Sequence, residues 1–240
     1  MRVVVRTVAA TGHLPPPGAD EVHVWQFRLD PPVDGAEQVL SAAERGRADR
    51  YRVPRARRQF VAARGMLRVL LGRYIGCPPG AVPLAAEPGG KPTLGPGAGP
   101  HFNLSHSAGV GLVAVAGRPV GVDVEEVRDL PNAEGLVERF YAAEERAAFA
   151  RLPAGVREDG FFRAWTCKEA LLKAVGRGLQ DLEGCVVELD PRRAPRVVRF
   201  DPGPWQLAVW EPWPGYAAAV AVESPEPLRL EPEGDGRKRE

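Results

Sequence analysis

The chain has 240 residues, of which 44% are hydrophobic and 26% charged, with a formal net charge of +1. This length and composition suit a globular protein of one large or two small domains. Balanced charge gives no basic surface for nucleic acid, and no apolar run approaches the roughly 20 residues that span a bilayer. The three cysteines form neither a disulfide framework nor a zinc motif. We therefore expect a cytoplasmic protein that binds neither nucleic acid nor membrane.

The first expected elements are a strand and a long helix. A Pro-rich lead-in is followed by EVHVWQFRLD (21–30), whose alternating residues are typical of a strand, so we expect the fold to begin near Asp20. From Pro54 to Ile75, apolar residues recur at helical spacing. Pro54 stands at the start of this segment and Gly76 just past its end, which predicts the bounds of the helix.

The rest of the chain alternates between predicted strands and helices. HFNLSHS (101–107) and VGLVAVA (110–116) predict two strands, and VGVDVE (120–125) continues them as a hairpin after a turn at 117–119. Two helical segments follow, and Gly176 is a candidate C-cap for the second. Their ranges are 136–152 and 158–176, and the last three predicted strands are 185–189, 204–210 and 215–223.

VGVDVE places Asp123 and Glu125 two residues apart in a valine-rich segment. In a strand, both carboxylates lie on the face opposite Val122 and Val124, so they can converge on a hard cation such as Mg²⁺. The acidic outer face of a half-exposed strand gives the same pattern. The pair alone does not separate the two interpretations.

The helical segment 158–176 carries a second candidate group. Trp165, Glu169 and Lys173 fall on one helix face, while Cys167 falls on the opposite, apolar face, where a buried thiol is expected. Glu169 and Lys173 also have the spacing of an ordinary i, i+4 ion pair. Only four of the 32 basic residues are lysines, and Lys168 and Lys173 both lie in this helix. A lysine is a compact charge suited to phosphate.

Other candidate phosphate contacts lie earlier in the chain. Lys91 lies in a Gly-rich loop, and Ser105 with His106 offers a hydroxyl and an imidazole, although a capped turn with a structural histidine is the alternative. The first long helix carries arginines that can clamp phosphates or cover its outer face. These arginines are Arg55, Arg58 and Arg64.

Taken together, the motifs form an ordered series. RRQFVAAR, GGKPTL, FNLSHS, VGVDVE, RFYAAEE and FFRAWTCKEALLKAVGRGL follow one another along the chain. The series resembles the Sfp-type 4′-phosphopantetheinyl transferases, whose motifs are GKP, FN(I/L)SHS, G(I/V)D(I/V)E and WxxKEAxxK followed by GxGL. It covers about residues 20–222, and the whole set is far more specific than any one motif.

The resemblance implies an α+β fold of two similar subdomains related by pseudo-twofold symmetry, each a small sheet with a long helix. We expect a lead-in at 1–19, subdomains at 20–118 and 119–223, and a mobile tail at 224–240, with the metal and catalytic residues in the second subdomain. The cleft between the halves is expected to hold coenzyme A and Mg²⁺, or Mn²⁺ in its place. Both halves in one chain imply a monomer.

The resemblance also implies residue roles. Asp123, Glu125 and Glu169 match the metal ligands, Glu169 matches the proposed base, and Lys173 matches the lysine that contacts the pyrophosphate; Asp123, Glu169 and Lys173 are thus the catalytic set. Gln59 stands where relatives often have a basic residue, so the choice among the three arginines is left open. The expected coenzyme-binding residues are Arg55, Arg58, Arg64, Lys91, Pro92, Ser105, His106, Lys168 and Lys173, with Lys91 and Pro92 on the adenine side and His106 at the 3′-phosphate.

The reaction implied is transfer of 4′-phosphopantetheine from coenzyme A to a serine of an apo acyl or peptidyl carrier protein, with release of adenosine 3′,5′-bisphosphate. The carriers belong to fatty acid, polyketide or nonribosomal peptide synthesis. Two alternatives use the same residues. One is a Mg²⁺-dependent phosphohydrolase, which needs no acceptor protein, and the other is a non-catalytic module that binds coenzyme A or carrier proteins.

Overall fold

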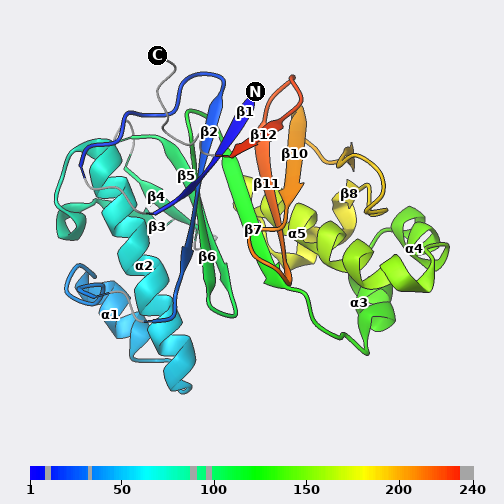
Figure 1. The fold of residues 1–240 in the computed structure, drawn as a ribbon, viewed down its shortest axis with the longest axis horizontal. Helices are drawn as coiled ribbons and strands as arrows, with labels where there is room; N and C mark the ends of the chain where they lie inside the picture. The colour runs from blue at the N-terminus through cyan, green and yellow to red at the C-terminus, as the bar shows by residue number, and fades with distance from the viewer. Residues whose placement is uncertain (9–11, 32–33, 87–90, 96–98, 233–240) are drawn as a thin grey trace, which may run out of the picture.

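The main elements of the chain form four layers: a long helix, a five-stranded sheet, a three-stranded sheet and a second long helix (Figure 1). The computed structural model describes residues 1–8, 12–31, 34–86, 91–95 and 99–232. Within these ranges, no helix is both long and apolar enough to cross a membrane.

The helices are α1 (Ala42–Ala48), α2 (Pro54–Ile75), α3 (Ala133–Phe140), α4 (Ala143–Ala150) and α5 (Arg157–Val175). The five-stranded sheet has the order β12 (Arg229–Pro232), β1 (Arg2–Thr7), β2 (Glu21–Arg28), β6 (Val110–Ala116) and β5 (His101–Ser107). The three-stranded sheet has the order β10 (Trp205–Trp210), β11 (Tyr216–Glu223) and β7 (Val120–Glu126). Two short sheets pair β3 (Leu84–Ala86) with β4 (Pro92–Leu94) and β8 (Val186–Val187) with β9 (Val197–Arg199).

The two halves of the molecule share one topology. In the first half, β2 is followed by α2 and then by the hairpin β5–β6; in the second, β7 is followed by α5 and then by β10 and β11. The strand that comes last along the chain in each half, β6 or β11, lies at the centre of its three strands. It pairs with β2 and β5 in the first half and with β7 and β10 in the second, so the orders β2-β6-β5 and β7-β11-β10 correspond. The expected α+β class with two similar halves is confirmed.

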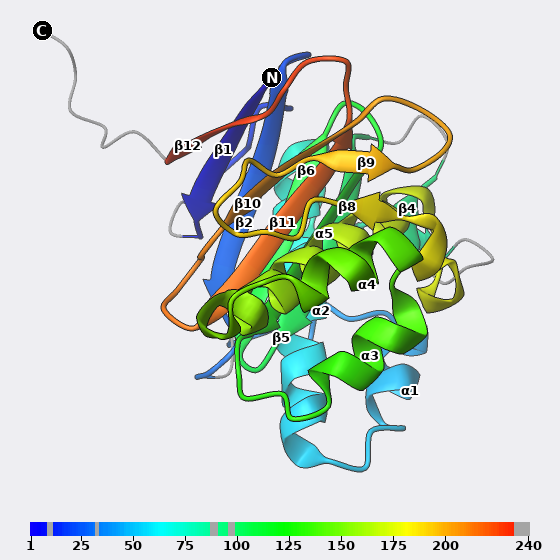
Figure 2. The ribbon, with the colours of Figure 1, turned by 90° about the vertical axis from the view of Figure 1, so that its right-hand side faces the viewer.

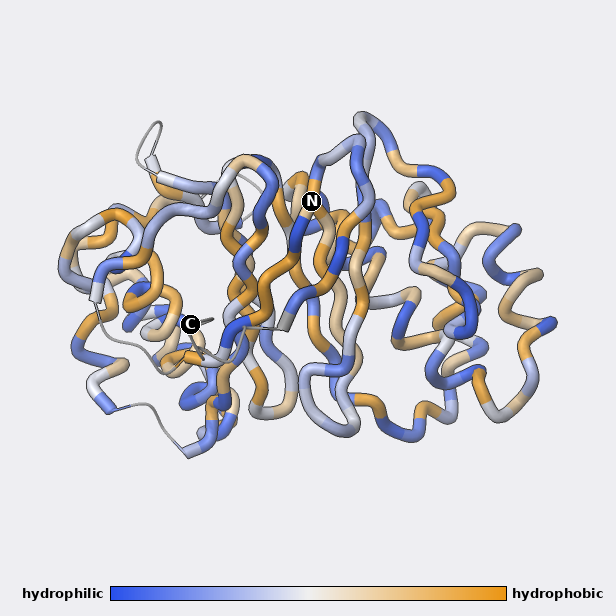
Figure 3. Tube along the Cα trace, turned by 45° about the horizontal axis from the view of Figure 1, so that its top comes forward, coloured by the Kyte–Doolittle hydropathy of each residue, from blue (hydrophilic) through white to orange (hydrophobic). Residues whose placement is uncertain are grey.

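The valines of β7 explain why the two sheets pack face to face. Val122 and Val124 lie in a core cluster with Val22 and Val24 of β2, while Asp123 lies on the other face of the strand, opposite Ala219 of β11. Helices α2 and α5 cover the outer faces of the two sheets (Figures 1 and 2). Figure 3 shows hydrophobic residues concentrated along the central strands. The strand alternation predicted for VGVDVE is therefore confirmed.

Both long helices end as the sequence predicts. Gly76 follows α2 with φ of 68°, and Gly176 follows α5 with φ of 71°. A left-handed residue at this position favours glycine because a Cβ would be strained there. The predicted bounds of α2 are confirmed, as is Pro54 as its first residue. The predicted helix over 136–152 is two helices, because the chain extends at Tyr141 and Ala142 between α3 and α4.

Three expectations are wrong. The lead-in contains β1, which pairs in parallel with β2, so the fold begins well before Asp20. The tail contains β12, which pairs with β1; residues 233–240 of the tail lie outside the described residues. β5 and β6 do form a hairpin, but β7 leaves it and pairs with β11 in the second sheet. β12 and β7 pair with strands that lie far away in the sequence, and such pairing leaves little trace in local alternation.

Candidate active site

The edge strand β5 of the first sheet lies beside the edge strand β7 of the second, and side chains join them. Asn103 Oδ1 accepts a hydrogen bond from the Val122 amide at 2.9 Å. Ser105 Oγ donates to Asp123 Oδ1 at 2.7 Å, and Ser107 Oγ donates to a carboxylate oxygen of Glu125 at 2.8 Å. Alternate residues of FNLSHS therefore form the polar seam between the halves, because residues i, i+2 and i+4 of a strand share one face.

Helix α5 brings Glu169 and Lys173 over the same point. The helix packs closely on β7 at Gly121, where a Cβ would lie 1.9 Å from the carbonyl oxygen of Ala170. Lys173 Nζ then lies 2.5 Å from Asp123 Oδ1, 3.7 Å from Glu169 Oε2 and 3.2 Å from Ser105 Oγ. Four residues predicted from three motifs, namely Ser105, Asp123, Glu169 and Lys173, thus meet at one place in the structure.

Three carboxylates, which we call the acidic group, lie around Lys173 and carry more negative charge than one lysine can balance. Asp123, Glu125 and Glu169 face this one ammonium, and burial, reinforced by Asp123, raises the pKa of Glu125 to about 7. Burial also raises the pKa of Glu169, against the opposing effect of Lys173. Burial alone would lower the pKa of Lys173, but Asp123 and Glu169 outweigh it and raise the pKa, so the lysine stays charged.

The chemistry of this group fits a hard divalent cation. Asp123 Oδ2 and Glu169 Oε1 are buried and have no hydrogen-bond partner among the described residues. Carboxylate oxygens are the ligands that Mg²⁺ prefers. In the described part of the chain, however, no three acidic, histidine or cysteine side chains are grouped closely enough to form a metal site as they stand. Lys173 Nζ instead occupies a position against Asp123.

A cavity of about 270 Å³ opens beside Lys173, and we call it the cationic cavity. Arg47 of α1, Arg64 of α2, His106 of β5 and Lys173 of α5 all line it. The pKa of His106 is lowered, first because the surrounding atoms desolvate the ring and then because of Lys173 and the two arginines. The positively charged side chains of Arg47, Arg64 and Lys173 around one small cavity suit a phosphate group. The remaining lining residues are Tyr51, Phe60, Ala63, Pro92, Leu104 and Ser105.

The predicted loop residues lie next to this cavity. Pro92 lines the cationic cavity and also a neighbouring cavity of about 380 Å³, which Lys91 lines as well. Lys91 Nζ donates to the carbonyl oxygen of Ala174 at 2.7 Å, near the C-terminal end of α5. The loop is thus attached to the helix that carries Lys173. Of the three candidate arginines, only Arg64 lines the cationic cavity: Arg55 is exposed and donates to the carbonyl oxygen of Ala108, and Arg58 is exposed.

Lys168 is not at the site, and the expectation that it binds coenzyme A is wrong. Its side chain is fully buried inside the second half, where Nζ lies 2.5 Å from Glu145 Oε2, donates to the carbonyl oxygen of Cys185 and sits over the ring of Tyr141. Glu145 also accepts hydrogen bonds from two backbone amides, so each of the two buried charges has its counter-charge and further polar partners. Cys167 is buried as expected, and burial raises the pKa of its thiol to about 12, which excludes a nucleophilic role.

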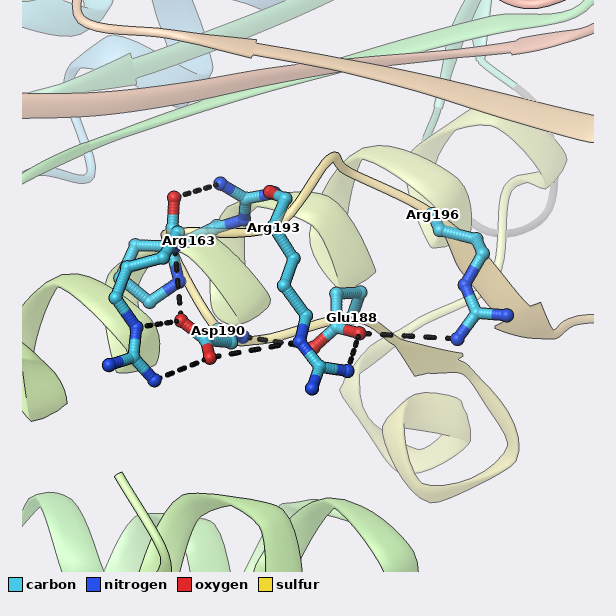
Figure 4. A network of polar contacts seen from close by, with 7 residues as sticks. Arg163, Glu188, Asp190, Arg193 and Arg196 are labelled. Carbon is cyan, nitrogen blue, oxygen red and sulfur yellow. Dashed lines mark hydrogen bonds and ion pairs between the residues drawn. The ribbon is translucent and has the colours of Figure 1, made fainter. Parts of the chain in front are cut away.

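Another group of arginines lies around β8 and β9, where it contacts Glu188 and Asp190 (Figure 4). Arg192 and Arg193 contact Asp190, and Arg193 and Arg196 contact Glu188. Arg163 donates to the carbonyl oxygens of Pro191 and Arg193. The contacts tie this loop to α5, and carboxylates already balance part of the charge, so the group is a structural network.

Arg47 is the functional candidate that the motifs missed, because α1 was not predicted. The signal was present in the sequence. Ser41 and Glu44 have the S-x-x-E spacing of a capping box, and in the structure Glu44 N donates to Ser41 Oγ while Ser41 N donates to Glu44 Oε2. Arg47 lies one turn further on in this helix.

The comparisons with known proteins agree with the geometry. The family model described as 4′-phosphopantetheinyl transferase superfamily matches residues 119–221. The 4′-phosphopantetheinyl transferase HetI of Nostoc sp. is 41% identical over 211 residues, covering 85% of this chain and 88% of that protein. The transferase psf-1 of Bacillus pumilus is 29% identical over 204 residues, covering 79% and 86% of the two chains, and Sfp of Bacillus subtilis is 28% identical over 139 residues, covering 57% and 61%.

This chain belongs to the 4′-phosphopantetheinyl transferase superfamily. The resemblance seen in its motifs is confirmed, and so is its class as an enzyme of that superfamily.

Proposed function

We propose that the protein transfers the 4′-phosphopantetheine group of coenzyme A to a serine of an apo acyl or peptidyl carrier protein, in a reaction that requires Mg²⁺ or Mn²⁺. The observation that carries this proposal is the position of the acidic group beside the cationic cavity, with Lys173 belonging to both. Three carboxylates suit a cation, and the cavity suits the phosphates of a nucleotide. A coenzyme A molecule that spans them has its diphosphate next to Lys173.

In the proposed reaction the serine Oγ forms a bond to the β-phosphorus of coenzyme A. The bond from that phosphorus to the bridging oxygen breaks, and adenosine 3′,5′-bisphosphate leaves. Phosphoryl-type transfer depends mainly on positioning and charge neutralisation. Lys173 has the charge and position to stabilise the negative charge that develops on the leaving oxygen.

Asp123, Glu125 and Glu169 would hold the cation, which when bound supplies charge neutralisation at the diphosphate oxygens. Glu169 would accept the serine proton, directly or through water. Its raised pKa, caused first by burial, brings it closer to the pH at which a general base works best. Ser105 and Ser107 fix Asp123 and Glu125 by donating hydrogen bonds to them. Ser105 and His106 also line the cationic cavity, where His106 would contact the 3′-phosphate.

Chromatography of the nucleotide products tests this function against hydrolysis. The protein is incubated with coenzyme A and Mg²⁺, with and without an apo carrier protein. We expect adenosine 3′,5′-bisphosphate to appear only when the carrier is present, in an amount equal to the modified carrier. Release at the same rate without a carrier would indicate a phosphohydrolase and reject the transferase.

A further inference from the structure

The cationic cavity is built from two helices, and one carboxylate ties them together. Arg47 belongs to α1 and Arg64 to α2. Glu44 of α1 lies between Arg64 and Arg68 of α2: its Oε2 accepts a hydrogen bond from Arg68 Nε at 2.6 Å, and its Oε1 lies 3.6 Å from Arg64 Nε. Glu44 does not line the cavity. It lies against Arg64, which does line the cavity.

Glu44 is itself held in place. Its Oε2 also accepts the Ser41 amide at 2.8 Å as part of the capping box of α1. Arg68 is almost fully buried and donates to the carbonyl oxygens of Pro79 and Val82, so its guanidinium has a fixed position. With Oε2 engaged twice, Oε1 remains as the oxygen nearest Arg64. The carboxylate therefore has one orientation.

Arg64 needs this carboxylate to stay where it is. Its side chain is only 11% exposed, and the nearby charges on Arg47 and Arg68 repel it. Burial and these two arginines lower the pKa of Arg64, while Glu44 raises it. Without Glu44, three guanidiniums would crowd together with no counter-charge, and Arg64 would gain by turning towards water. Arg47 and Arg64 both lie against the ring of Phe60, so a shift of one disturbs the other.

We infer that Glu44 is a positioning residue that holds Arg64, and through α1 also Arg47, at the cationic cavity to receive the 3′-phosphate of coenzyme A. This inference rests on the proposed function. The diphosphate belongs beside Lys173 and the three carboxylates, which leaves the phosphate monoester for the side of the cavity formed by the two arginines and His106. A monoester dianion balances the positive charge that Glu44 leaves uncompensated.

The test compares two nucleotides that differ only in the 3′-phosphate, adenosine 3′,5′-bisphosphate and adenosine 5′-monophosphate, by titration calorimetry. We expect Glu44→Gln to weaken binding of the bisphosphate about tenfold, the size of one charge-assisted contact, and to change binding of the monophosphate by less than about twofold. Glutamine can still accept the Ser41 amide, so the cap of α1 is retained. Because the readout is a ratio of two affinities, a lower folded fraction does not change it.

Glu37→Gln is the matched control, since Glu37 is exposed and pairs with Arg57 away from the cavity. It should leave both affinities unchanged. In a protein that already carries Arg64→Gln, adding Glu44→Gln should weaken bisphosphate binding by a further factor of less than about two. The guanidinium that Glu44 positions is then already absent. In turnover with a carrier protein, Glu44→Gln should raise the KM for coenzyme A and leave kcat unchanged.

Equal losses for the two nucleotides, no loss, or tighter binding of the bisphosphate would each overturn the inference. Tighter binding would mean that Glu44 competes with phosphate for Arg64. The failure of the proposed function is a separate result: a wild-type protein that binds both nucleotides as expected but modifies no carrier protein rejects the transferase and leaves the role of Glu44 intact.

Discussion

Asp123 receives two hydrogen-bond donors on one oxygen, Ser105 Oγ and Lys173 Nζ, and leaves its other oxygen buried and without a partner among the described residues. If that oxygen serves a cation, Asp123→Asn should lower kcat/KM for transfer by about a thousandfold, a loss typical of a group that stabilises charge in the transition state. The fold should persist, because asparagine keeps the shape and accepts the same hydrogen bonds. Turnover assays and circular dichroism check both expectations, and a loss below tenfold would remove Asp123 from the metal site.

Lys173 places its ammonium against Asp123 Oδ1, next to the oxygen that would hold a cation. Lys173→Met should therefore tighten Mn²⁺ binding in the absence of coenzyme A by about tenfold, because the competing ammonium 2.5 Å from Asp123 is gone. The same change should weaken coenzyme A binding. Electron paramagnetic resonance of Mn²⁺ gives the first affinity and calorimetry the second. Weaker Mn²⁺ binding in the variant would show that Lys173 supports the metal site rather than competing for it.

Glu125 gives the metal-free protein a pH dependence. Its pKa is raised to about 7 in the folded protein, first by burial and then by Asp123, from an ordinary value of 4.5. Because the folded protein favours the protonated carboxyl of Glu125, this group stabilises the fold fully at pH values below 4.5, its pKa in the unfolded chain. This contribution is lost as the pH rises towards 7, its pKa in the folded protein. Thermal melting in EDTA should thus show Tm falling between about pH 4.5 and pH 7, and Glu125→Gln should flatten the profile. An unchanged profile in the variant would assign the effect to other groups.

At the scale of elements, the contact between β7 and α5 sets the geometry of the site. Gly121→Ala would place a Cβ 1.9 Å from the carbonyl oxygen of Ala170 and force the helix away from the strand. We expect a loss of about 3 kcal/mol in the free energy of unfolding, at the upper end for overpacking. Gly117→Ala is the control, since no atom lies within 4 Å of its added Cβ. Urea unfolding of both variants measures the difference, and equal stabilities would mean that the contact is not tight.

The buried pair of Lys168 and Glu145 joins α5 to the start of α4. Lys168→Met should destabilise the protein by about 3–5 kcal/mol, because it leaves a buried carboxylate without its counter-charge. The double variant Lys168→Met/Glu145→Gln should lose less, since no charge is then left unpaired. Chemical unfolding of the single and double variants separates these cases, and a double variant less stable than the single one would contradict the explanation.

The elements that could be predicted are those whose signals are local. Pro54 and Gly76 define α2, Gly176 ends α5, and the alternation in VGVDVE assigns the faces of β7. Lys168 was misplaced because helical spacing does not reveal its partner Glu145, which lies 23 residues earlier in the chain. Arg47 was missed because the short helix α1 depends on a capping box and on packing against α2.

At the scale of the whole molecule, the chain passes from one sheet to the other between β6 and β7, and this crossing creates the site. Both ends of the described chain join the first sheet: β1 and β12 pair in parallel along its edge. The parallel pairing of β12 with β1 could not be predicted from local patterns, because the two strands lie at opposite ends of the described chain. The site itself was easier to predict, since its residues come from a few compact motifs.

Two similar halves meet at β5 and β7, and the cationic cavity lies where α2, β5 and α5 come together. The first half supplies Arg64 and His106, and the second supplies Asp123, Glu169 and Lys173. On the proposed function, one half mainly binds the nucleotide and the other mainly performs the chemistry. Neither half contains the whole site.

Intact-protein mass spectrometry of an apo carrier protein tests whether this protein transfers phosphopantetheine. The carrier is incubated with coenzyme A, Mg²⁺ and this protein, beside matched samples containing EDTA or the Asp123→Asn variant. We expect a gain of one phosphopantetheine group, about 340 Da as a single covalent modification, in the first sample only. No gain with several unrelated acyl and peptidyl carriers, by a folded protein that binds coenzyme A, would contradict it, and so would an equal gain in EDTA.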